Sequence, residues 1–253
     1  MELPPVGLGT MGIDDPAVVA RAIDLGYRHL DTAQIYENEA VVGEGIAMAD
    51  TPREELTVAT KVWASNLAPE DVRVSTEASL ERLGLDHVDL LYVHRPIEAY
   101  DPATTLPAFD ALREDGLVRE VGVSNFEPDD LEHAREHLES PIAANQVEYH
   151  PLFRPTRALA DARANDYELV GYSPLAGGRV FDLPVVSEIA DAHDASPAQV
   201  AIAWLLEQGI RVIPKASSEA HLRANLAAAE LSLSPEEVAR IDAIEEREEL
   251  FPE

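Results

Sequence analysis

Cysteine is absent from this 253-residue sequence, which excludes disulfides, zinc sites built on thiolates and a catalytic thiol. No apolar run approaches the roughly 18–20 residues that a membrane-spanning helix needs. The first residues, MELPPVGLGT, lack a basic start followed by an apolar stretch, so we expect no signal peptide and a cytoplasmic protein. Lysine is almost absent as well, since Lys61 and Lys215 are the two lysines among 19 basic residues.

Positive charge is scarce throughout, and the formal net charge is -29. The acidic residues are interspersed along the chain, as in PEDVRVSTEASLERLGLD, rather than gathered in a tail. A surface this acidic repels nucleic acid and anionic membranes, so we expect neither as a partner. The favoured explanation is a solvated surface adapted to high salt, and a recognition patch for a basic partner is the alternative. Scarce lysine beside many arginines resembles proteins of salt-adapted organisms.

Residues that start and stop helices recur along the whole chain. Asp15 and Pro16 open an apolar-periodic run that stops at Gly26, which predicts an N-cap, a first helical residue and a C-terminal stop. Ser234 and Glu237 have the spacing of a capping box. Similar signals predict helices that begin at Pro69, Pro102 and Pro197 and close at Gly84, Gly116 and Gly209.

Short runs rich in apolar residues lie between these helices and predict strands. Several run without alternation, as expected for parallel strands buried on both faces. The expected strands span residues 5–9, 27–31, 57–61, 88–94, 118–124, 143–147, 168–172 and 211–215. This pattern predicts an α/β fold, a single-domain (β/α)8 TIM barrel over residues 1–253. A doubly wound open sheet is the alternative, but GLGTMG matches its glycine fingerprint by letters alone.

Polar residues stand at the ends of these strands. In a (β/α)8 barrel, the C-terminal ends of the strands form the active site. One polar residue there carries little information, because a lone histidine at a strand end is more often structural. Several on one face indicate a functional cluster, and they are Asp31, Lys61, His94, Ser124, Asn125, Gln146, Tyr172, Ser173 and Lys215.

The residue types in this cluster suit the reduction of a carbonyl group. A Lys61 ammonium paired with Asp31 costs less to bury than an isolated one. Tyr36 lies in the loop after Asp31, and the neighbouring ammonium is expected to lower the pKa of its phenol. Such a phenol can donate a proton to a carbonyl oxygen, and a neutral His94 can orient that oxygen. The hydride must then come from a bound cofactor.

Other readings of the same residues remain open. Lys215 ends the last expected strand and precedes two serines and a helix, so it could bind a phosphate. A metal-dependent barrel hydrolase would draw ligands from Asp31, His94, Glu148 and His150, although close ligand spacing is found for the last two alone. A non-catalytic nucleotide-binding subunit on the same fold is a further alternative. We expect an enzyme that uses no metal.

Ordered motifs along nearly the whole chain resemble those of the aldo-keto reductase family, in its prokaryotic, 2,5-diketo-gluconate reductase-like type. GYRHLDTAQIYENEAVVGEGI carries Asp31 and Tyr36, TKVW carries Lys61, and DLLYVHRP carries His94. GVSNF, NQVEYHP, GYSPL and IPKAS follow in the family's order. No single motif is specific for the family, but the order of all the motifs from about Gly7 onwards is specific for it.

The resemblance implies an NAD(P)H-dependent reductase of aldehydes and ketones to alcohols. Tyr36 would be the general acid, tuned by Lys61 paired with Asp31, and His94 would position the carbonyl. Met11, Trp63 and Arg95 would line the substrate pocket. The implied cofactor-binding residues are Thr10, Ser124, Asn125, Gln146, Tyr172, Ser173, Leu175, Lys215, Ser217, Ser218, His221 and Asn225. The family uses no metal, and a monomer that takes a small-molecule carbonyl is expected.

Three departures from the family pattern affect these expectations. Arg95 stands where many members have a pocket tryptophan, and it either selects anionic or polyhydroxylated carbonyls or points to solvent. Six residues after Lys215, an arginine that favours the 2′-phosphate is replaced by His221, with Arg223 two residues on. NADPH is the expected cofactor and NADH the alternative. The chain ends soon after its last expected helix, which predicts an open pocket and broad specificity.

Overall fold

Eight parallel strands form one sheet in the order β1 to β8 in the computed structural model, which describes residues 1–252. The strands are β1 (Leu8–Gly9), β2 (His29–Asp31), β3 (Thr57–Val62), β4 (Val88–Val93), β5 (Val118–Ser124), β6 (Ile142–Glu148), β7 (Glu168–Tyr172) and β8 (Arg211–Val212). Val6 bridges Val212 in parallel, and the Gly7 N–H donates to the Val212 carbonyl at 2.8 Å. These contacts close the sheet, so the predicted barrel is confirmed.

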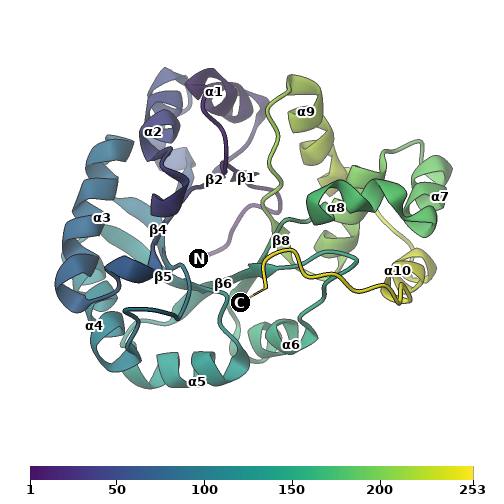
Figure 1. The fold of residues 1–253 in the computed structure, drawn as a ribbon. Helices are drawn as coiled ribbons and strands as arrows, with labels where there is room; N and C mark the ends of the chain where they lie inside the picture. Colours follow the sequence, from purple (N-terminus) through teal and green to yellow (C-terminus); the bar gives the residue numbers. More distant parts are fainter. Residues whose placement is uncertain (253) are drawn as a thin grey trace.

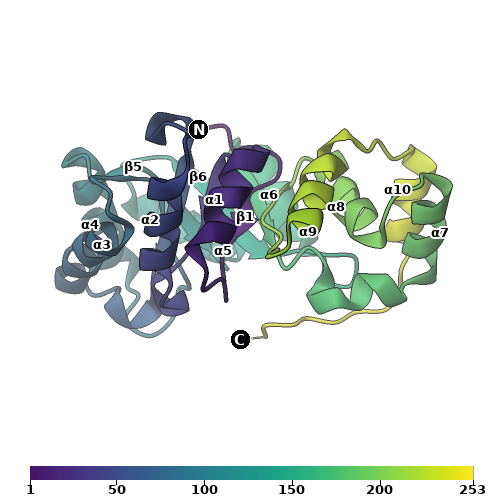
Figure 2. The same ribbon diagram turned by 90° about the horizontal axis from the view of Figure 1, so that it is seen from above.

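Helices surround the barrel as an outer ring (Figure 1). The α-helices are α1 (Pro16–Leu25), α2 (Glu39–Met48), α3 (Pro69–Leu83), α4 (Pro102–Glu114), α5 (Pro128–His137), α6 (Thr156–Asn165), α7 (Pro184–Ala192), α8 (Pro197–Glu207), α9 (Glu219–Ala227) and α10 (Pro235–Asp242). The 3₁₀ turns are η1 (Gln34–Tyr36), η2 (Arg53–Glu55), η3 (Ala64–Asn66), η4 (Ala176–Asp182) and η5 (Ala228–Glu230). Figure 2 shows α7 and α10 at one end of the molecule. Among residues 1–252, no helix has the length and apolar character to span a bilayer.

The helix boundaries follow the start and stop residues of the sequence. The Asp15 carboxylate accepts from the Ala17 N–H at 2.9 Å, and Gly26 closes α1 with φ at 113°. Glycine suits this left-handed position because it has no Cβ to clash. The capping box of Ser234 and Glu237 is formed at the start of α10. The predicted stops and caps are therefore confirmed.

Residues of one parity on each strand point into the barrel. The lower interior is packed by a cluster of Leu3, Ala59, Leu90, Tyr92, Ala144, Val170 and Ile213. Two residues further along their strands, Ala59 is followed by Lys61 and Ala144 by Gln146. Because side chains alternate along a strand, these polar residues share the interior face but lie nearer its C-terminal end. This apolar cluster thus lies beneath a layer of polar side chains at the C-terminal ends of the strands.

The last strand is shorter than expected. The sequence analysis predicted a strand over residues 211–215, whereas β8 ends at Val212. Pro214 has no N–H to donate, so the ladder cannot continue through it. Its carbonyl still accepts from the Gly9 N–H at 3.3 Å. Lys215 therefore leaves the barrel rim on an extended segment rather than on the strand itself.

Candidate active site

A cavity of about 550 Å³ opens at the C-terminal ends of the strands. Its walls contain Gly9, Thr10, Met11, Asp31, Ile35, Tyr36, Trp63, His94, Arg95, Ser124, Asn125, Gln146, Tyr172, Ser173, Pro174, Leu175, Gly177, Gly178, Ile213, Pro214, Lys215 and Phe251. Most of the site residues expected from the sequence are in this set. They come from strands far apart in the sequence, so the closed barrel is what brings them together.

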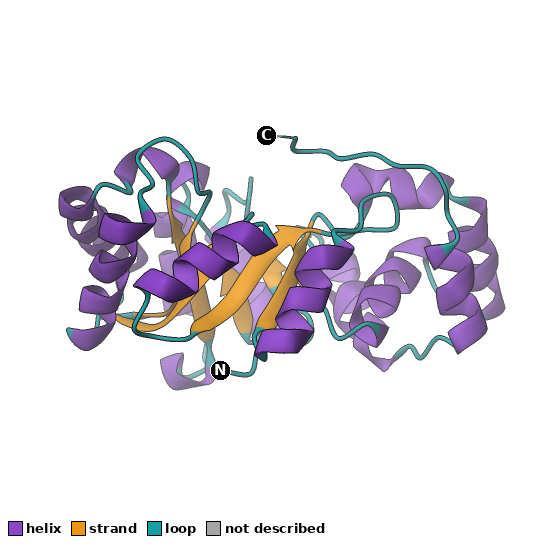
Figure 3. Cartoon of the chain, turned by 90° about the horizontal axis from the view of Figure 1, so that it is seen from below, coloured by secondary structure: helices purple, strands orange, loops and turns teal. Residues whose placement is uncertain are grey.

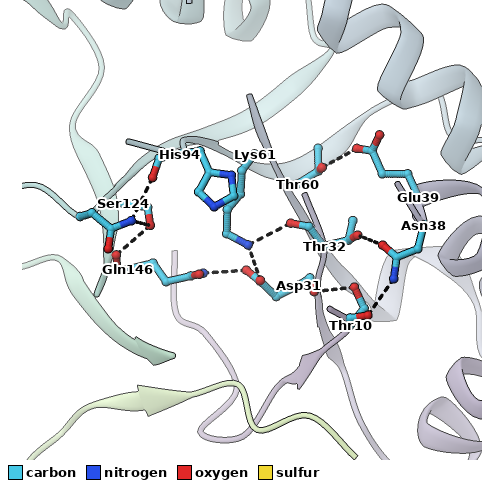
Figure 4. Close-up of polar contacts among 11 residues, drawn as sticks. Thr10, Asp31, Thr32, Asn38, Glu39, Thr60, Lys61, His94, Ser124 and Gln146 are labelled. Atoms are coloured by element: carbon cyan, nitrogen blue, oxygen red, sulfur yellow. Dashed lines mark hydrogen bonds and ion pairs between the residues drawn. The ribbon is translucent and has the colours of Figure 1, made fainter. Parts of the chain in front are cut away.

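A buried ion pair lies at the floor of this cavity (Figure 4). The Lys61 ammonium is fully buried and donates to the Asp31 carboxylate and, at 2.9 Å, to the Thr32 carbonyl. The Gln146 amide donates to the second Asp31 oxygen at 2.7 Å. Burial alone would lower the pKa of Lys61, but Asp31 and Tyr36 raise it above its ordinary value. The ammonium therefore stays charged at neutral pH.

Tyr36 ends the turn η1 and lies beside this ammonium. The Lys61 nitrogen is 5.1 Å from the centroid of the Tyr36 ring. Burial raises the pKa of Tyr36, and the opposing effect of Lys61 does not cancel it. The sequence analysis anticipated the effect of Lys61 but was wrong about the net direction, because it left out the cost of removing phenolate from water. The phenol is therefore protonated at neutral pH and its proton is available.

Asn38 holds the loop that carries Tyr36, and the sequence analysis missed it. Its side-chain amide donates to the Thr10 carbonyl at 2.7 Å and to the Ile13 carbonyl at 3.0 Å. Its oxygen accepts from the Thr32 hydroxyl at 3.0 Å, as Figure 4 shows. The loop after β1 and the loop after β2 are thus joined through one buried side chain. Sequence offers a weak signal for this role, since asparagine is common in loops.

Glu39, the residue after Asn38, holds the same segment against β3 and α3. Its carboxylate is buried and accepts from the Thr60 hydroxyl at 2.5 Å and from Arg82 at 2.6 Å. Thr60 precedes Lys61 on β3 and points to the outer face of the barrel, where α2 begins (Figure 4). The strand that carries the ammonium is therefore bound to the helix that follows Tyr36.

His94 forms the wall beside Tyr36. The His94 ring meets the Tyr36 ring edge-on with centroids 6.0 Å apart and the Trp63 ring at 5.0 Å. Burial lowers the pKa of His94 to about 2, and the Lys61 charge acts in the same direction. Within residues 1–252, its Nδ1 has no hydrogen-bond partner. An unpaired lone pair costs less than an unpaired N–H, so we assign the proton to Nε2.

Amide and hydroxyl groups on another wall of the cavity form a network of hydrogen bonds. Asn125 donates to the His94 carbonyl at 3.0 Å and to the Ser124 hydroxyl at 3.1 Å, and it accepts from the Tyr172 hydroxyl at 2.9 Å. The Ser124 hydroxyl donates to the Gln146 carbonyl at 2.9 Å. Asn125 has a φ of 61°, a left-handed conformation that asparagine adopts more readily than most residues. This network fixes the orientation of the Asn125 amide and of the Ser124 and Tyr172 hydroxyls.

The loop after β7 presents its backbone to the cavity. Ser173 and Ala176 have positive φ values of 51°, and Gly177 and Gly178 have values of 61° and 99°. Left-handed conformations at non-glycine residues are costly and gather at functional sites. Alternating backbone conformations of this kind form concave surfaces that can bind anions.

The rim near Lys215 matches the expectations less completely. Its ammonium donates to the Ser217 hydroxyl at 3.1 Å, and the Ser218 hydroxyl caps α9 by accepting from the His221 N–H at 3.3 Å. Asn225 is buried beside the Tyr27 hydroxyl. Of the expected cofactor-binding residues, those outside the cavity walls are Ser217, Ser218, His221 and Asn225. Their roles therefore stay predictions.

Several residues of the cavity wall were not expected from the sequence. They are Gly9, Ile35, Pro174, Gly177, Gly178, Ile213, Pro214 and Phe251. Most are apolar neighbours of expected residues and could have been found by extending each motif by one or two positions. Phe251 is different, because it comes from the segment after α10 and no motif points to it.

The possible metal ligands do not converge. Within residues 1–252, no group of three or more histidine, cysteine, aspartate and glutamate side chains is placed to hold a metal ion. Glu148 and His150 contact each other at 2.8 Å, but Asp31 instead pairs with Lys61 and Gln146. The reading as a metal-dependent hydrolase therefore lacks a ligand set in the described residues.

The sequence profile of the aldo/keto reductase family matches residues 5–246 of this chain. The chain belongs to the aldo/keto reductase family. Methylglyoxal reductase DkgB from Salmonella typhi is 37% identical over 251 residues, which cover 97% of this chain and 94% of that protein. A crystal structure described as a putative 2,5-diketo-D-gluconic acid reductase B has a TM-score of 0.91 at 40% identity, covering 95% of this chain and 87% of that one.

A second solved structure extends the comparison. An aldo-keto reductase from a Medee basin deep-sea metagenome library has a TM-score of 0.95 at 34% identity, covering 100% of this chain and 95% of that one. The family resemblance inferred from the motifs is confirmed. This aldo-keto reductase is an oxidoreductase that reduces aldehydes and ketones with a nicotinamide cofactor. The alternatives, a non-catalytic subunit and a metal-dependent hydrolase, find no support in these relatives.

Proposed function

We propose that this enzyme reduces small carbonyl compounds with NADPH and that Tyr36 supplies the proton. The observation that carries the proposal is the fully buried Lys61–Asp31 pair directly behind Tyr36. An ammonium at that place stabilises the phenolate that forms when Tyr36 gives up its proton. A buried ion pair is weak evidence for a stabilising role, so a chemical role explains its position better.

The side chains around the cavity fit a nicotinamide dinucleotide. Ser124, Asn125 and Gln146 offer amide and hydroxyl groups of the kind that bind a carboxamide, and the Tyr172 ring offers a face for stacking. The positive-φ loop after β7 offers a concave backbone surface for the pyrophosphate. When bound, the cofactor supplies the hydride.

Tyr36 and His94 act on the oxygen of the substrate. A carbonyl oxygen that contacts both side chains receives a hydrogen bond from the neutral His94 and the proton of the Tyr36 phenol. The low pKa of His94, caused by burial and by Lys61, keeps its ring neutral over the whole working range of pH. His94 therefore orients the carbonyl without competing with Tyr36 as an acid.

Lys215 supports NADPH rather than NADH as the cofactor. Its ammonium lies on the cavity wall and reaches Ser217 near the start of α9, a suitable place for a 2′-phosphate. Arg223 is bound to Glu219 at 2.8 Å, and Glu219 also pairs with Arg21. Arg223, which was considered as a replacement for the family's phosphate ligand, is thus already engaged by a carboxylate on its own helix, which keeps NADH as the second candidate.

The substrates named for the relatives suggest small dicarbonyls. One relative is named a methylglyoxal reductase and another structure a putative 2,5-diketo-D-gluconic acid reductase. Arg95 lines the cavity and brings a positive charge to its wall, which suits a keto acid or a polyhydroxylated carbonyl. We further propose that the protein is a monomer, as the family resemblance implies, and that it is cytoplasmic.

Turnover and cofactor binding can be measured separately to test this proposal. Wild type is mixed with NADPH, methylglyoxal, a keto acid and an aromatic aldehyde in molar KCl, and the loss of absorbance at 340 nm is followed. The proposal predicts turnover with NADPH above that with NADH. Replacement of Lys215 by methionine should weaken NADPH binding more than NADH binding. Equal weakening for both cofactors would contradict the role assigned to Lys215.

A further inference from the structure

The segment after α10 returns to the barrel and lies over the C-terminal end of its strands. In Figure 1 it runs from α10 towards the middle of the barrel, and in Figure 3 it lies on the side opposite the N-terminus. We call residues 248–251 the strap. Two of its backbone N–H groups donate to the Glu148 carboxylate, Leu250 at 2.7 Å and Phe251 at 3.1 Å. Each carboxylate oxygen therefore receives one strap amide.

Glu148 is held rigidly in the orientation that receives the strap. It is the last residue of β6 and is 3% exposed. The buried His150 ring contacts the Glu148 carboxylate at 2.8 Å through Nε2, while its Nδ1 accepts from the Leu152 N–H at 3.2 Å. Because Nδ1 is an acceptor, the ring proton lies on Nε2 and is donated to Glu148. His150 thus helps to fix the orientation of the Glu148 carboxylate.

The other end of the strap is also held. The Glu248 N–H donates to the Leu152 carbonyl at 2.9 Å. The Glu248 carboxylate pairs with Arg179 at 2.6 Å. Arg179 belongs to η4, the turn whose glycines line the cavity. The strap therefore joins the end of β6 to the loop that follows β7.

Phe251 is the residue of the strap that reaches the cavity. It lines the cavity, and its ring meets the Tyr172 ring edge-on with centroids 5.8 Å apart. We propose that Glu148 is a positioning residue that docks the strap and thereby places Phe251 on the cavity wall beside Tyr172. The sequence analysis weighed Glu148 and His150 as metal ligands and expected a short, open C-terminal side. The docked strap gives the cavity an aromatic residue on that side.

The chemistry of Glu148 supports docking over simple packing. Burying a carboxylate is costly unless hydrogen bonds compensate, and an apolar residue would fill the same place without that cost. The compensation comes largely from the strap, since two of the donors to Glu148 are strap amides. A charge-assisted hydrogen bond is about twice as strong as a neutral one. Docking therefore requires a side chain with two acceptor oxygens.

The test compares Glu148→Gln with Phe251→Ala and the double variant. Glutamine keeps the shape of the Glu148 side chain, but its NH2 group is a donor and would face one of the two strap N–H groups. The strap should therefore detach. Hydrogen exchange at the peptide that contains residues 250–251 should become faster in Glu148→Gln. The KM for an aromatic aldehyde should rise about three- to tenfold in either single variant, as expected for one lost aromatic contact, with kcat nearly unchanged. The double variant should show no further rise.

Glu245→Gln is the matched control, because Glu245 is an exposed carboxylate just before the strap and the charge change is the same. It should leave both exchange and KM unchanged. Equally fast exchange of the strap in wild type and Glu148→Gln would overturn the proposal, as would additive KM effects in the double variant. A lower melting temperature of Glu148→Gln with unchanged exchange would reduce Glu148 to a packing role. The inference rests on the proposed function for its kinetic part alone, since exchange is measured without turnover.

Discussion

Separating the two members of the buried Lys61–Asp31 pair tests whether the pair serves stability or chemistry. Methionine at position 61 retains the length of the lysine side chain and removes its charge. The Asp31 carboxylate then remains buried, with the Gln146 amide as a remaining donor at 2.7 Å. Breaking a buried pair from one side typically costs about 3–5 kcal/mol. We expect the lower part of that range, because Gln146 still satisfies one carboxylate oxygen.

The double variant Asp31→Asn with Lys61→Met removes both charges together. Buried pairs replaced as a unit are often neutral in stability, so its free energy of unfolding should lie closer to wild type than either single variant does. Activity should behave differently. The two variants that lack Lys61 should lose most of their turnover, because neither retains an ammonium beside Tyr36.

Urea unfolding at constant KCl gives the free energies, and NADPH oxidation gives the turnover. Additive losses, with the double variant as unstable as the two singles summed, would refute the electrostatic reasoning. Recovered turnover in the double variant would show that the pair is structural. Cofactor binding should be measured for each variant so that an unfolded protein is not mistaken for an inactive one.

Further predictions concern pH, the loop of Tyr36 and salt. Because the pKa of His94 is lowered to about 2, the folded protein leaves it neutral while the unfolded chain binds a proton below about pH 6.5. Stability is therefore lost as pH falls from that value, by about 1.4 kcal/mol per unit, and His94→Asn should show a correspondingly smaller loss between pH 7.5 and 5.0 in urea titrations. Asn38→Asp places a carboxylate against two carbonyl oxygens and should destabilise by about 2–4 kcal/mol, whereas Asn38→Ser should cost less; equal losses in thermal melts would contradict the donor role. With a net charge of -29, the melting temperature should rise between 0.1 M and 1 M KCl as the Debye length falls from about 10 Å to about 3 Å, and a flat profile would contradict the salt-adapted surface.

The barrel could be predicted because its determinants are local. Proline and glycine at helix ends, such as Pro16 and Gly26, act through backbone geometry alone and need no tertiary contact. Buried parallel strands can also be recognised in the sequence by continuous apolar runs. The end of β8 was placed too late, although Pro214, which has no N–H for the ladder, marks it in the sequence.

The polar layer at the strand ends could be predicted for a similar reason. Asp31, Lys61 and His94 interrupt apolar runs, and the barrel fold brings all strand ends to one face. Contacts made across loops could not be predicted in this way. The Asn38 amide donates to carbonyls that lie 25 and 28 residues away, and the Phe251 N–H donates to the carboxylate of Glu148, 103 residues away. No spacing within a motif encodes such distances.

The net pKa of Tyr36 illustrates a second limit. The position of Tyr36 in the loop after Asp31, the expected partner of Lys61, suggested the influence of Lys61, and the structure agrees with that sign. The larger contribution comes from burial, which depends on the whole wall of the cavity and not on any single neighbour. Electrostatic arguments from sequence therefore identify partners more reliably than net shifts.

The central claim is that Tyr36 donates the proton during carbonyl reduction. The most direct measurement is NADPH oxidation with methylglyoxal in molar KCl by wild type and by Tyr36→Phe, with NADPH affinity determined for both by fluorescence. The account predicts that turnover falls by at least about 100-fold in the variant, as for loss of a general acid, while NADPH binds with unchanged affinity. Turnover in Tyr36→Phe within a few fold of wild type would contradict it.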